Sequence, residues 1–238
     1  MIVRPIKTRV FKENENLERF IRAHVKSLKE NSVLVVTSKI VALAEGRTAD
    51  PTTTTKEELI KRESDVAIRT KYTWLTLSKG HLMSSAGIDE SNADGKYVLL
   101  PKDCFTSAAR LRAKLRKVYR VKHLGVLITD SRTLPLRVGA VGTALGYAGF
   151  KAIRDYRRTP DIFGRSFHIS RANIADGLAC AAVLAMGEGR EQHPLAVITG
   201  APVDFTERVK RGELAIPLAD DMYLPFLSGL LRPAKKRK

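Results

Sequence analysis

The run SVLVVTSK at residues 32–39 decides the fold of this chain. It is short, apolar and rich in β-branched residues, which is typical of a strand buried on both faces of a sheet. Two later runs have the same character, LGVLITD at residues 124–130 and PLAVITG at residues 194–200. Helical spacing of apolar residues separates these runs, at residues 17–28, 103–119 and 170–187. Strands that alternate with helices predict a mixed α/β (α+β) fold.

The segments between these runs predict smaller elements. Residues 52–71 open with threonines that can cap a helix, and residues 73–78 and 96–101 predict strands on either side of an acidic loop. The helix at residues 103–119 is expected to be amphipathic, with Val118 on its apolar face and Arg112 off that face. The Gly- and Ala-rich run at residues 138–150 indicates a close backbone approach, either to another chain or to a ligand, and it could equally pack inside one chain.

Composition narrows the class of protein. The chain has 238 residues, 44% of them hydrophobic, which is enough for one large domain or two small ones. Its two cysteines, Cys104 and Cys180, fit neither a disulfide framework nor a zinc spacing. No run is long enough to span a bilayer, and the first residues lack the apolar core of a secretory signal. We therefore expect a cytoplasmic protein without a membrane partner.

The chain is strongly basic, with 42 Lys+Arg against 25 Asp+Glu and a formal net charge of +17. Three interpretations are open: nucleic-acid binding, attraction of small anionic substrates, and a solvated basic surface without one target. Aromatic residues make up only 6% of the chain, and no stacking motif is present. These features argue against a nucleic-acid partner.

One loop is acidic although the chain as a whole is basic. SSAGIDESNADG at residues 84–95 gathers Asp89, Glu90, Asn92 and Asp94 without a basic residue. Acidic and amide residues favour turns, so an ordinary turn explains the loop. Carboxylate and amide oxygens also suit a hard divalent cation, so a metal site explains it as well.

Polar residues also follow two of the predicted strands. Ser38 and Lys39 come directly after the first strand, and Asp130, Ser131 and Arg132 come where the second is expected to end. Ligands of α/β sheets gather at the carboxyl ends of strands. Asp130 could therefore share a metal with Asp89, while lysine and arginine side chains hold phosphate oxygens. Each residue alone also has an ordinary explanation, since a lysine after a strand is usually solvated and TDSR is a common turn.

The standard phosphate-binding and hydrolase motifs are missing from the sequence, but four segments together resemble a known family. VLVVTSKIVALAEGR, SAGIDESN, GVLITDS and DIFGR…IADGLA…MGEG occur in the order seen in the coenzyme F420-0:L-glutamate ligase (γ-glutamyl ligase) family. TWLTL, AGIDESNADGK and LITDSRTLPLR look closer to its putative folate-metabolism branch. The similarity runs from Thr8 to Gly200.

This resemblance implies an amide ligase that adds L-glutamate to a carboxylate acceptor through an acyl phosphate. It implies GTP or ATP as co-substrate, Mg²⁺ or Mn²⁺ as cofactor, and a homodimer of intertwined subunits. The γ-glutamyl ligase-like catalytic unit would cover residues 1–228, with two subdomains possible, and residues 229–238 would form a flexible basic tail.

The resemblance also implies roles for individual residues. The metal ligands would be Asp89, Asp130, Ser131 and Glu188. The nucleotide would contact Thr8, Arg9, Val10, Phe11, Ser38, Lys39, Asn92, Met186, Gly187, Glu188 and Gly189. The catalytic set would be Asp89, Asp130, Lys39 and Arg132.

Some positions depart from the family pattern. Leu43 stands where deazaflavin ligases have a lysine, RTLPLR replaces FGRPWR after Asp130, and Gly177 replaces a glutamate in the later helix. Arg132 and Arg137 could then clamp two carboxylates by forked hydrogen bonds, which favours a folate over the F420-0 acceptor. A basic nucleic-acid-binding protein and an inactive nucleotide-binding family member are the alternatives to a ligase.

Overall fold

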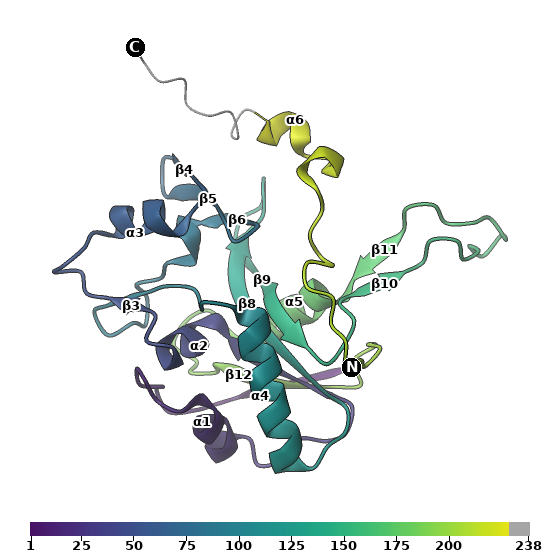
Figure 1. Ribbon diagram of the computed structural model, residues 1–238, viewed down its shortest axis with the longest axis horizontal. Coiled ribbons are helices and arrows are strands. Elements are labelled where there is room, and N and C mark those ends of the chain that lie inside the picture. Colours follow the sequence, from purple (N-terminus) through teal and green to yellow (C-terminus); the bar gives the residue numbers. More distant parts are fainter. Residues whose placement is uncertain (229–238) are drawn as a thin grey trace. The chain divides into compact units, whose positions relative to one another are not determined.

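The computed structural model describes residues 1–228, which divide into two units (Figure 1). The first unit comprises Met1–Thr48 and Leu100–Leu214, and the second comprises Ala49–Leu99 and the residues from Ala215 onward. The predicted mixed α/β class is confirmed. The predicted tail at residues 229–238 lies outside the described residues.

A five-stranded sheet forms the centre of the first unit. Its order is β1-β12-β2-β8-β9, and the strands are β1 (Ile2–Ile6), β12 (Leu195–Thr199), β2 (Ser32–Thr37), β8 (Leu124–Thr133) and β9 (Ala140–Ala148). Only the central pair, β2 and β8, is parallel; the other neighbours are antiparallel. Because the two most apolar runs of the sequence form that parallel pair, their carboxyl ends lie at one edge of the sheet.

Helices cover both faces of this sheet (Figure 1). The first unit contains α1 (Leu17–His24), α2 (Ser38–Ala44), α4 (Cys104–Tyr119) and α5 (Ile174–Met186). Side chains of α1, α2 and α4 share one buried cluster with Leu34, Val36 and Val126 of the sheet. Side chains of α5 share a second cluster with Val33 and Val35. The alternation of Val33, Leu34, Val35 and Val36 between these clusters is the two-sided burial that the apolar run predicts.

The second predicted strand is longer than the sequence indicates. It was expected to end at Asp130, but β8 continues to Thr133, so Ser131 and Arg132 lie within a strand and not in a turn. The continuation is paired throughout with β9. Pairing with a long partner therefore overrides the turn tendency of the TDSR sequence.

The Gly-rich run packs inside its own chain. A Cβ atom at Gly142 would lie 2.3 Å from the carbonyl oxygen of Ala179 in α5, and one at Gly146 would lie 2.5 Å from the backbone of Cys104 in α4. Both helices belong to the same unit as β9. The expected close approach exists, but its partners are helices of this chain, so the run no longer supports a homodimer. The homodimer stays a prediction from the family resemblance.

A two-stranded hairpin extends from the first unit. It consists of β10 (Ile153–Asp155) and β11 (Arg171–Asn173), and Figure 1 shows it as an arm beyond the edge of the sheet. The loop between the strands exposes Ile162, Phe163 and Ile169.

The second unit is built around α3 (Lys56–Glu63), which packs on Ile88 and Leu99 through Leu59 and Ile60. Thr55 caps this helix in a reciprocal capping box with Glu58, as the threonine run predicts. Its other elements are β4 (Val66–Arg69), β5 (Trp74–Ser78), β6 (His81–Ser84), η1 (Ser85–Gly87), β7 (Tyr97–Val98), η2 (Leu218–Asp220) and α6 (Leu224–Leu227), while β3 (Thr48–Ala49) lies where the chain passes between the units. Strand β6 was not expected, and the strand predicted at residues 96–101 shrinks to β7.

Other differences are small. The helix predicted at residues 17–28 ends at His24, although Val25 and Leu28 are buried as its spacing requires. In α4 two side chains differ from the prediction. Arg112, expected off the apolar face, is buried, and Val118, expected on that face, is 37% exposed. Arg112 is buried because it donates to the Leu124 carbonyl and to both carboxylate oxygens of Glu207. Within residues 1–228 neither cysteine forms a disulfide, and no helix has the length and apolarity needed to cross a membrane.

Candidate functional site

The carboxyl ends of β2 and β8 bring two predicted site residues together. Thr37 and Thr129 are register partners of the parallel pair, and Ser38 and Asp130 follow them. The Ser38 hydroxyl donates to Oδ1 of Asp130 over 3.1 Å. Ser38 is 5% exposed, so this bond holds one oxygen of Asp130 at the strand end. Ser38 and Asp130 therefore lie together, while the metal that Asp130 was expected to share with Asp89 stays a prediction.

A second contact joins two more predicted residues. The Ser131 hydroxyl donates to Oε1 of Glu188 over 2.6 Å. Glu188 follows Gly187, which ends α5 with a φ of +82°. This turn carries the chain from the helix to the end of β8. We refer to Ser38, Asp130, Ser131 and Glu188 as the strand-end cluster.

The strand-end cluster consists of two hydrogen-bonded pairs, and because Asp130 and Ser131 are neighbours in β8, their side chains leave opposite faces of the strand. Each pair offers a carboxylate and a hydroxyl, with no nitrogen or sulfur, and such oxygens suit a hard divalent cation. Among the described residues, no three of the side chains of His, Cys, Asp and Glu gather into a metal-binding group. Magnesium sites commonly use only one or two carboxylates and complete their coordination with water and substrate phosphates. The cluster is thus suited to an ion that arrives with a nucleotide.

The segments predicted to bind nucleotide also meet. The Thr8 amide donates to the Gln192 carbonyl over 2.9 Å, which joins the segment after β1 to the segment after α5. The Arg9 guanidinium pairs with Glu15 and holds the pKa of that carboxyl down at about 2. Val10 is 67% exposed. Val10 is therefore open to a ligand, whereas Arg9 already has an ionic partner.

Two of the predicted nucleotide contacts have buried apolar side chains. Phe11 is 6% exposed and packs edge-on against Phe20, and Met186 is 2% exposed in the cluster beneath α5. Both belong to the core, so only their backbone atoms can reach a nucleotide. Gly189, in contrast, lies in an exposed turn where its amide donates to Glu191 over 2.8 Å. Glu191 belongs to the stretch from Met186 to His193 that the resemblance matches to the nucleotide-binding turn.

Two of the predicted basic residues lie on the elements that carry Ser38 and Asp130. Lys39 is the second residue of α2 and is half-buried. Arg132 is in β8, and its Nε atom is buried without a hydrogen-bond partner among the described residues. A buried donor without a partner costs about 1–3 kcal/mol and is rare outside functional sites. Arg137, which was expected to act with Arg132, is exposed in the connection between β8 and β9.

Asp89 and Asn92 belong to the second unit. The Asp89 backbone bridges to Val98, and its carboxylate accepts from the amide and the hydroxyl of Ser91, over 2.7 and 3.0 Å. Glu90 pairs with Lys56 over 3.1 Å, and Asn92 has a φ of +50°. The acidic loop is therefore a turn with an internally bonded aspartate, as the simpler interpretation requires. Metal binding by Asp89 and nucleotide binding by Asn92 stay predictions.

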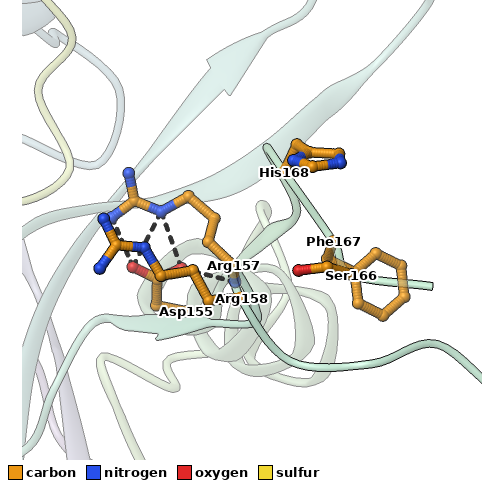
Figure 2. A pocket seen from close by; sticks show the side chains of 6 residues that line it. All are labelled: Asp155, Arg157, Arg158, Ser166, Phe167 and His168. Carbon is orange, nitrogen blue, oxygen red and sulfur yellow. Dashed lines mark hydrogen bonds and ion pairs between the residues drawn. The ribbon is translucent and has the colours of Figure 1, made fainter. Parts of the chain in front are cut away.

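A cavity of about 440 Å³ lies on the hairpin arm. Figure 2 shows its lining, which consists of Asp155, Arg157, Arg158, Ser166, Phe167 and His168. The Arg157 guanidinium donates hydrogen bonds of 2.6 to 3.0 Å to the Asp155 carboxylate and keeps the pKa of Asp155 at about 2. No residue that the sequence predicts for the site lines this cavity.

Sequence reasoning missed one further carboxylate beside the cluster. Asp176, in the first turn of α5, accepts hydrogen bonds from the Thr143 hydroxyl over 3.1 Å and the Ala144 amide over 2.8 Å. Thr143 is the cross-strand partner of Asp130. The IADGLA segment was noticed as part of the resemblance, but an acidic residue in a first helical turn is ordinary and gives no reason to select it.

Comparison with known proteins adds to this geometry. The family model described as F420-0:Gamma-glutamyl ligase matches residues 5–200. Three curated relatives bear the name Coenzyme F420:L-glutamate ligase. The relative from Methanocaldococcus jannaschii is 38% identical over 60% of this chain and 57% of its own length. The relative from Methanopyrus kandleri is 34% identical over 73% and 76% of the two chains, and that from Archaeoglobus fulgidus 30% over 82% and 85%.

Proposed function

The chain belongs to the F420-0:γ-glutamyl ligase family, a family of amide ligases, and we propose that it joins L-glutamate to a carboxylate acceptor with the hydrolysis of a nucleoside triphosphate. The observation that carries the proposal is the strand-end cluster, in which Asp130 and Glu188 are each held by a serine hydroxyl. Family membership alone would not require each of these carboxylates to be oriented by a hydroxyl.

The chemistry of amide formation explains why such a cluster is needed. A carboxylate does not acylate an amine at neutral pH without a leaving group. In the proposed reaction an acceptor carboxylate oxygen attacks the γ-phosphorus, and the bond to the nucleoside diphosphate breaks. The glutamate amine then attacks the acyl carbon, loses its proton and releases inorganic phosphate. Both steps concentrate negative charge on oxygens, which basic groups and a divalent ion offset.

The residues of this chain have separate tasks in the proposal. Ser38 and Ser131 orient the carboxylates of Asp130 and Glu188, which would hold Mg²⁺ or Mn²⁺. When bound, the ion would neutralise and align phosphate oxygens. Lys39 and Arg132 lie on the same two elements, α2 and β8, and would bind phosphate or carboxylate oxygens. The proposal keeps Asp89 as a further ligand and Asn92 as a nucleotide contact on resemblance alone.

The names of the relatives support F420-0 as acceptor, because each is called a Coenzyme F420:L-glutamate ligase. The departures around Arg132 and Arg137 favour a folate, whose γ-carboxylate lies beside an α-carboxylate that arginine can bind. We propose that one of these two supplies the reacting carboxylate, with GTP or ATP as the phosphoryl donor. A direct assay decides both questions.

The assay incubates the protein with L-glutamate, Mg²⁺ or Mn²⁺, and either GTP or ATP. F420-0 and a monoglutamyl folate are offered together at equal concentration, and the products are separated by mass. We expect one acceptor to gain a glutamyl unit in the presence of metal and nucleotide. No mass increase under any combination would overturn the proposed function.

A pair of variants ties the activity to the site. Asp130→Asn should abolish ligation and weaken metal-dependent nucleotide binding, while the fold stays intact. Asp204→Asn is the matched control, because Asp204 is an exposed aspartate of the same unit. Calorimetry that shows equal metal and nucleotide affinity in both variants would refute the assignment of Asp130.

A further inference from the structure

The pairing of β8 with β9 is irregular just before the strand-end cluster. Ile128 pairs with Gly146 but Thr129 pairs with Ala144, so Leu145 is an extra residue in β9. Such a bulge bends the strand and changes the direction of the side chains that follow it. Thr129 is the first residue after this irregularity, and Asp130 and Ser131 follow it, opposite Thr143 and Gly142. The geometry of the cluster therefore depends on how β9 is fixed at the bulge.

Asp176 fixes β9 at this point. Its Oδ1 accepts both the Thr143 hydroxyl and the Ala144 amide, and its Oδ2 accepts the Asn173 side-chain amide over 2.7 Å. Ala144 and Thr143 are the cross-strand partners of Thr129 and Asp130. One carboxylate thus binds both residues of β9 that face Thr129 and Asp130. Bonds to a charged acceptor are also stronger than bonds between neutral groups.

The rest of α5 holds the same part of β9. The Cys180 thiol donates to the Gly142 carbonyl over 3.0 Å, and Gly142 lies against the backbone of Ala179. Gly142 is opposite Ser131, which in turn donates to Glu188 just beyond the helix. The first turn of α5 therefore binds β9 opposite Asp130, and Glu188 follows the other end of the same helix.

We propose that Asp176 is a positioning residue for the metal-binding oxygens of the strand-end cluster. It acts through Thr143 and Ala144, which hold β8 in the register that presents Asp130. This inference rests on the proposed function, because it assumes that Asp130 and Glu188 bind a divalent ion. Removal of Asp176 should loosen the site without removing any ligand.

The test measures Mn²⁺ binding by calorimetry and ligation as a function of Mn²⁺ concentration. Asp176→Ala should lower Mn²⁺ affinity roughly 10–100-fold, as loss of a supporting partner does in other metal sites. The Mn²⁺ concentration needed for half-maximal turnover should rise, and saturating Mn²⁺ should largely restore kcat. Asp130→Asn should not be restored in this way, since it lacks a ligand.

Two further substitutions separate positioning from general stability. Asn173→Ala removes the cap of α5, whose side-chain oxygen accepts from the Asp176 amide and whose side-chain amide donates to Asp176 Oδ2. It leaves both bonds from Asp176 to β9. It should lower thermal stability without changing Mn²⁺ affinity. Thr143→Val should weaken Mn²⁺ binding, and Thr143→Ser, which keeps the hydroxyl, should bind as the unsubstituted protein does. The threonine pair provides the answer even if Asp176→Ala does not fold.

The outcomes distinguish the inference from the proposal beneath it. Mn²⁺ binding that is lost in Asp130→Asn but unchanged in Asp176→Ala and Thr143→Val would overturn the positioning role and leave the metal site standing. Mn²⁺ affinity that Asp130→Asn does not change would overturn the metal site itself, and the positioning role with it. Equal loss in Asn173→Ala and Asp176→Ala would reduce Asp176 to a contributor to helix stability.

Discussion

A methyl group added at Gly142 should separate β9 from α5. The Cβ atom of alanine would lie 2.3 Å from the Ala179 carbonyl oxygen and 2.6 Å from its carbon, whereas ordinary contact begins at 3.4 Å. The clash is with helix backbone, which cannot rotate away as a flexible side chain can. The strand and the helix must therefore move apart by about an ångström, which is the extent of the overlap.

The free energy of this change follows from the contact. Overpacking in a well-packed interior costs about 1–3 kcal/mol. Replacing glycine restricts the unfolded chain and returns about 0.4–1 kcal/mol. We therefore expect Gly142→Ala to lower the free energy of unfolding by about 1–2 kcal/mol. The same displacement would break the bonds of Asp176 to Thr143 and Ala144, so the metal site should weaken as well.

Gly177→Ala is the matched control, because Gly177 lies in α5 and a Cβ atom there would meet nothing within 4 Å. In an exposed helical position alanine is more stable than glycine by about 0.5–1 kcal/mol. The two variants introduce the same methyl group but should change stability in opposite directions. For a chain of this size, their melting temperatures should differ by roughly 4–8 °C.

The assay is thermal unfolding followed by circular dichroism, together with Mn²⁺ calorimetry on both variants. Gly142→Ala should melt below the unsubstituted protein and bind Mn²⁺ more weakly, while Gly177→Ala should melt above it and bind Mn²⁺ normally. Equal melting temperatures for the two variants would refute the close contact between β9 and α5. A lower melting temperature with unchanged Mn²⁺ binding would refute the link from that contact to the strand-end cluster.

Three further predictions use other parts of the chain. Arg112 and Arg116 hold the pKa of Glu207 at about 2, below its ordinary 4.5. The stability that this carboxylate adds is therefore present above pH 4.5 and lost as the pH falls toward 2. Over that range the urea midpoint of Glu207→Gln should fall less than that of the unsubstituted protein. Glu188→Gln should weaken Mn²⁺ binding about tenfold by calorimetry, because it removes a charge from the ion's surroundings. Light scattering at micromolar concentration should give the mass of two chains, as the resemblance predicts, and a one-chain mass would contradict it.

The sequence predicts the parts of this fold that depend on local pattern. The apolar run at residues 32–39 becomes β2, the threonine run caps α3, and Gly187 ends α5. In each case the residues that produce the structure are neighbours along the chain, so spacing and capping chemistry are sufficient to predict it.

The predictions that failed depend on distant partners. Asp130 was taken as the end of a strand because TDSR favours a turn, yet β9 supplies hydrogen bonds that extend β8 to Thr133. Arg112 was placed on the outer side of its helix because arginine is usually exposed. The Arg112 side chain is nevertheless buried, because Glu207, far along the chain, is its ionic partner. Asp176 was not selected at all, because its importance lies in its contacts with β9.

Glu188 shows why the basic composition and the acidic site belong together. Three other carboxylates of the first unit are held by arginine: Glu15 by Arg9, Asp155 by Arg157 and Glu207 by Arg112. Glu188 has the Ser131 hydroxyl as its hydrogen-bond partner, and within the described residues it forms no ion pair. In a chain with 42 Lys+Arg against 25 Asp+Glu, basic partners are abundant. Glu188 is oriented by a hydroxyl and has no basic partner among the described residues. It is therefore available to a cation from solution, which is the property that the proposed metal site requires.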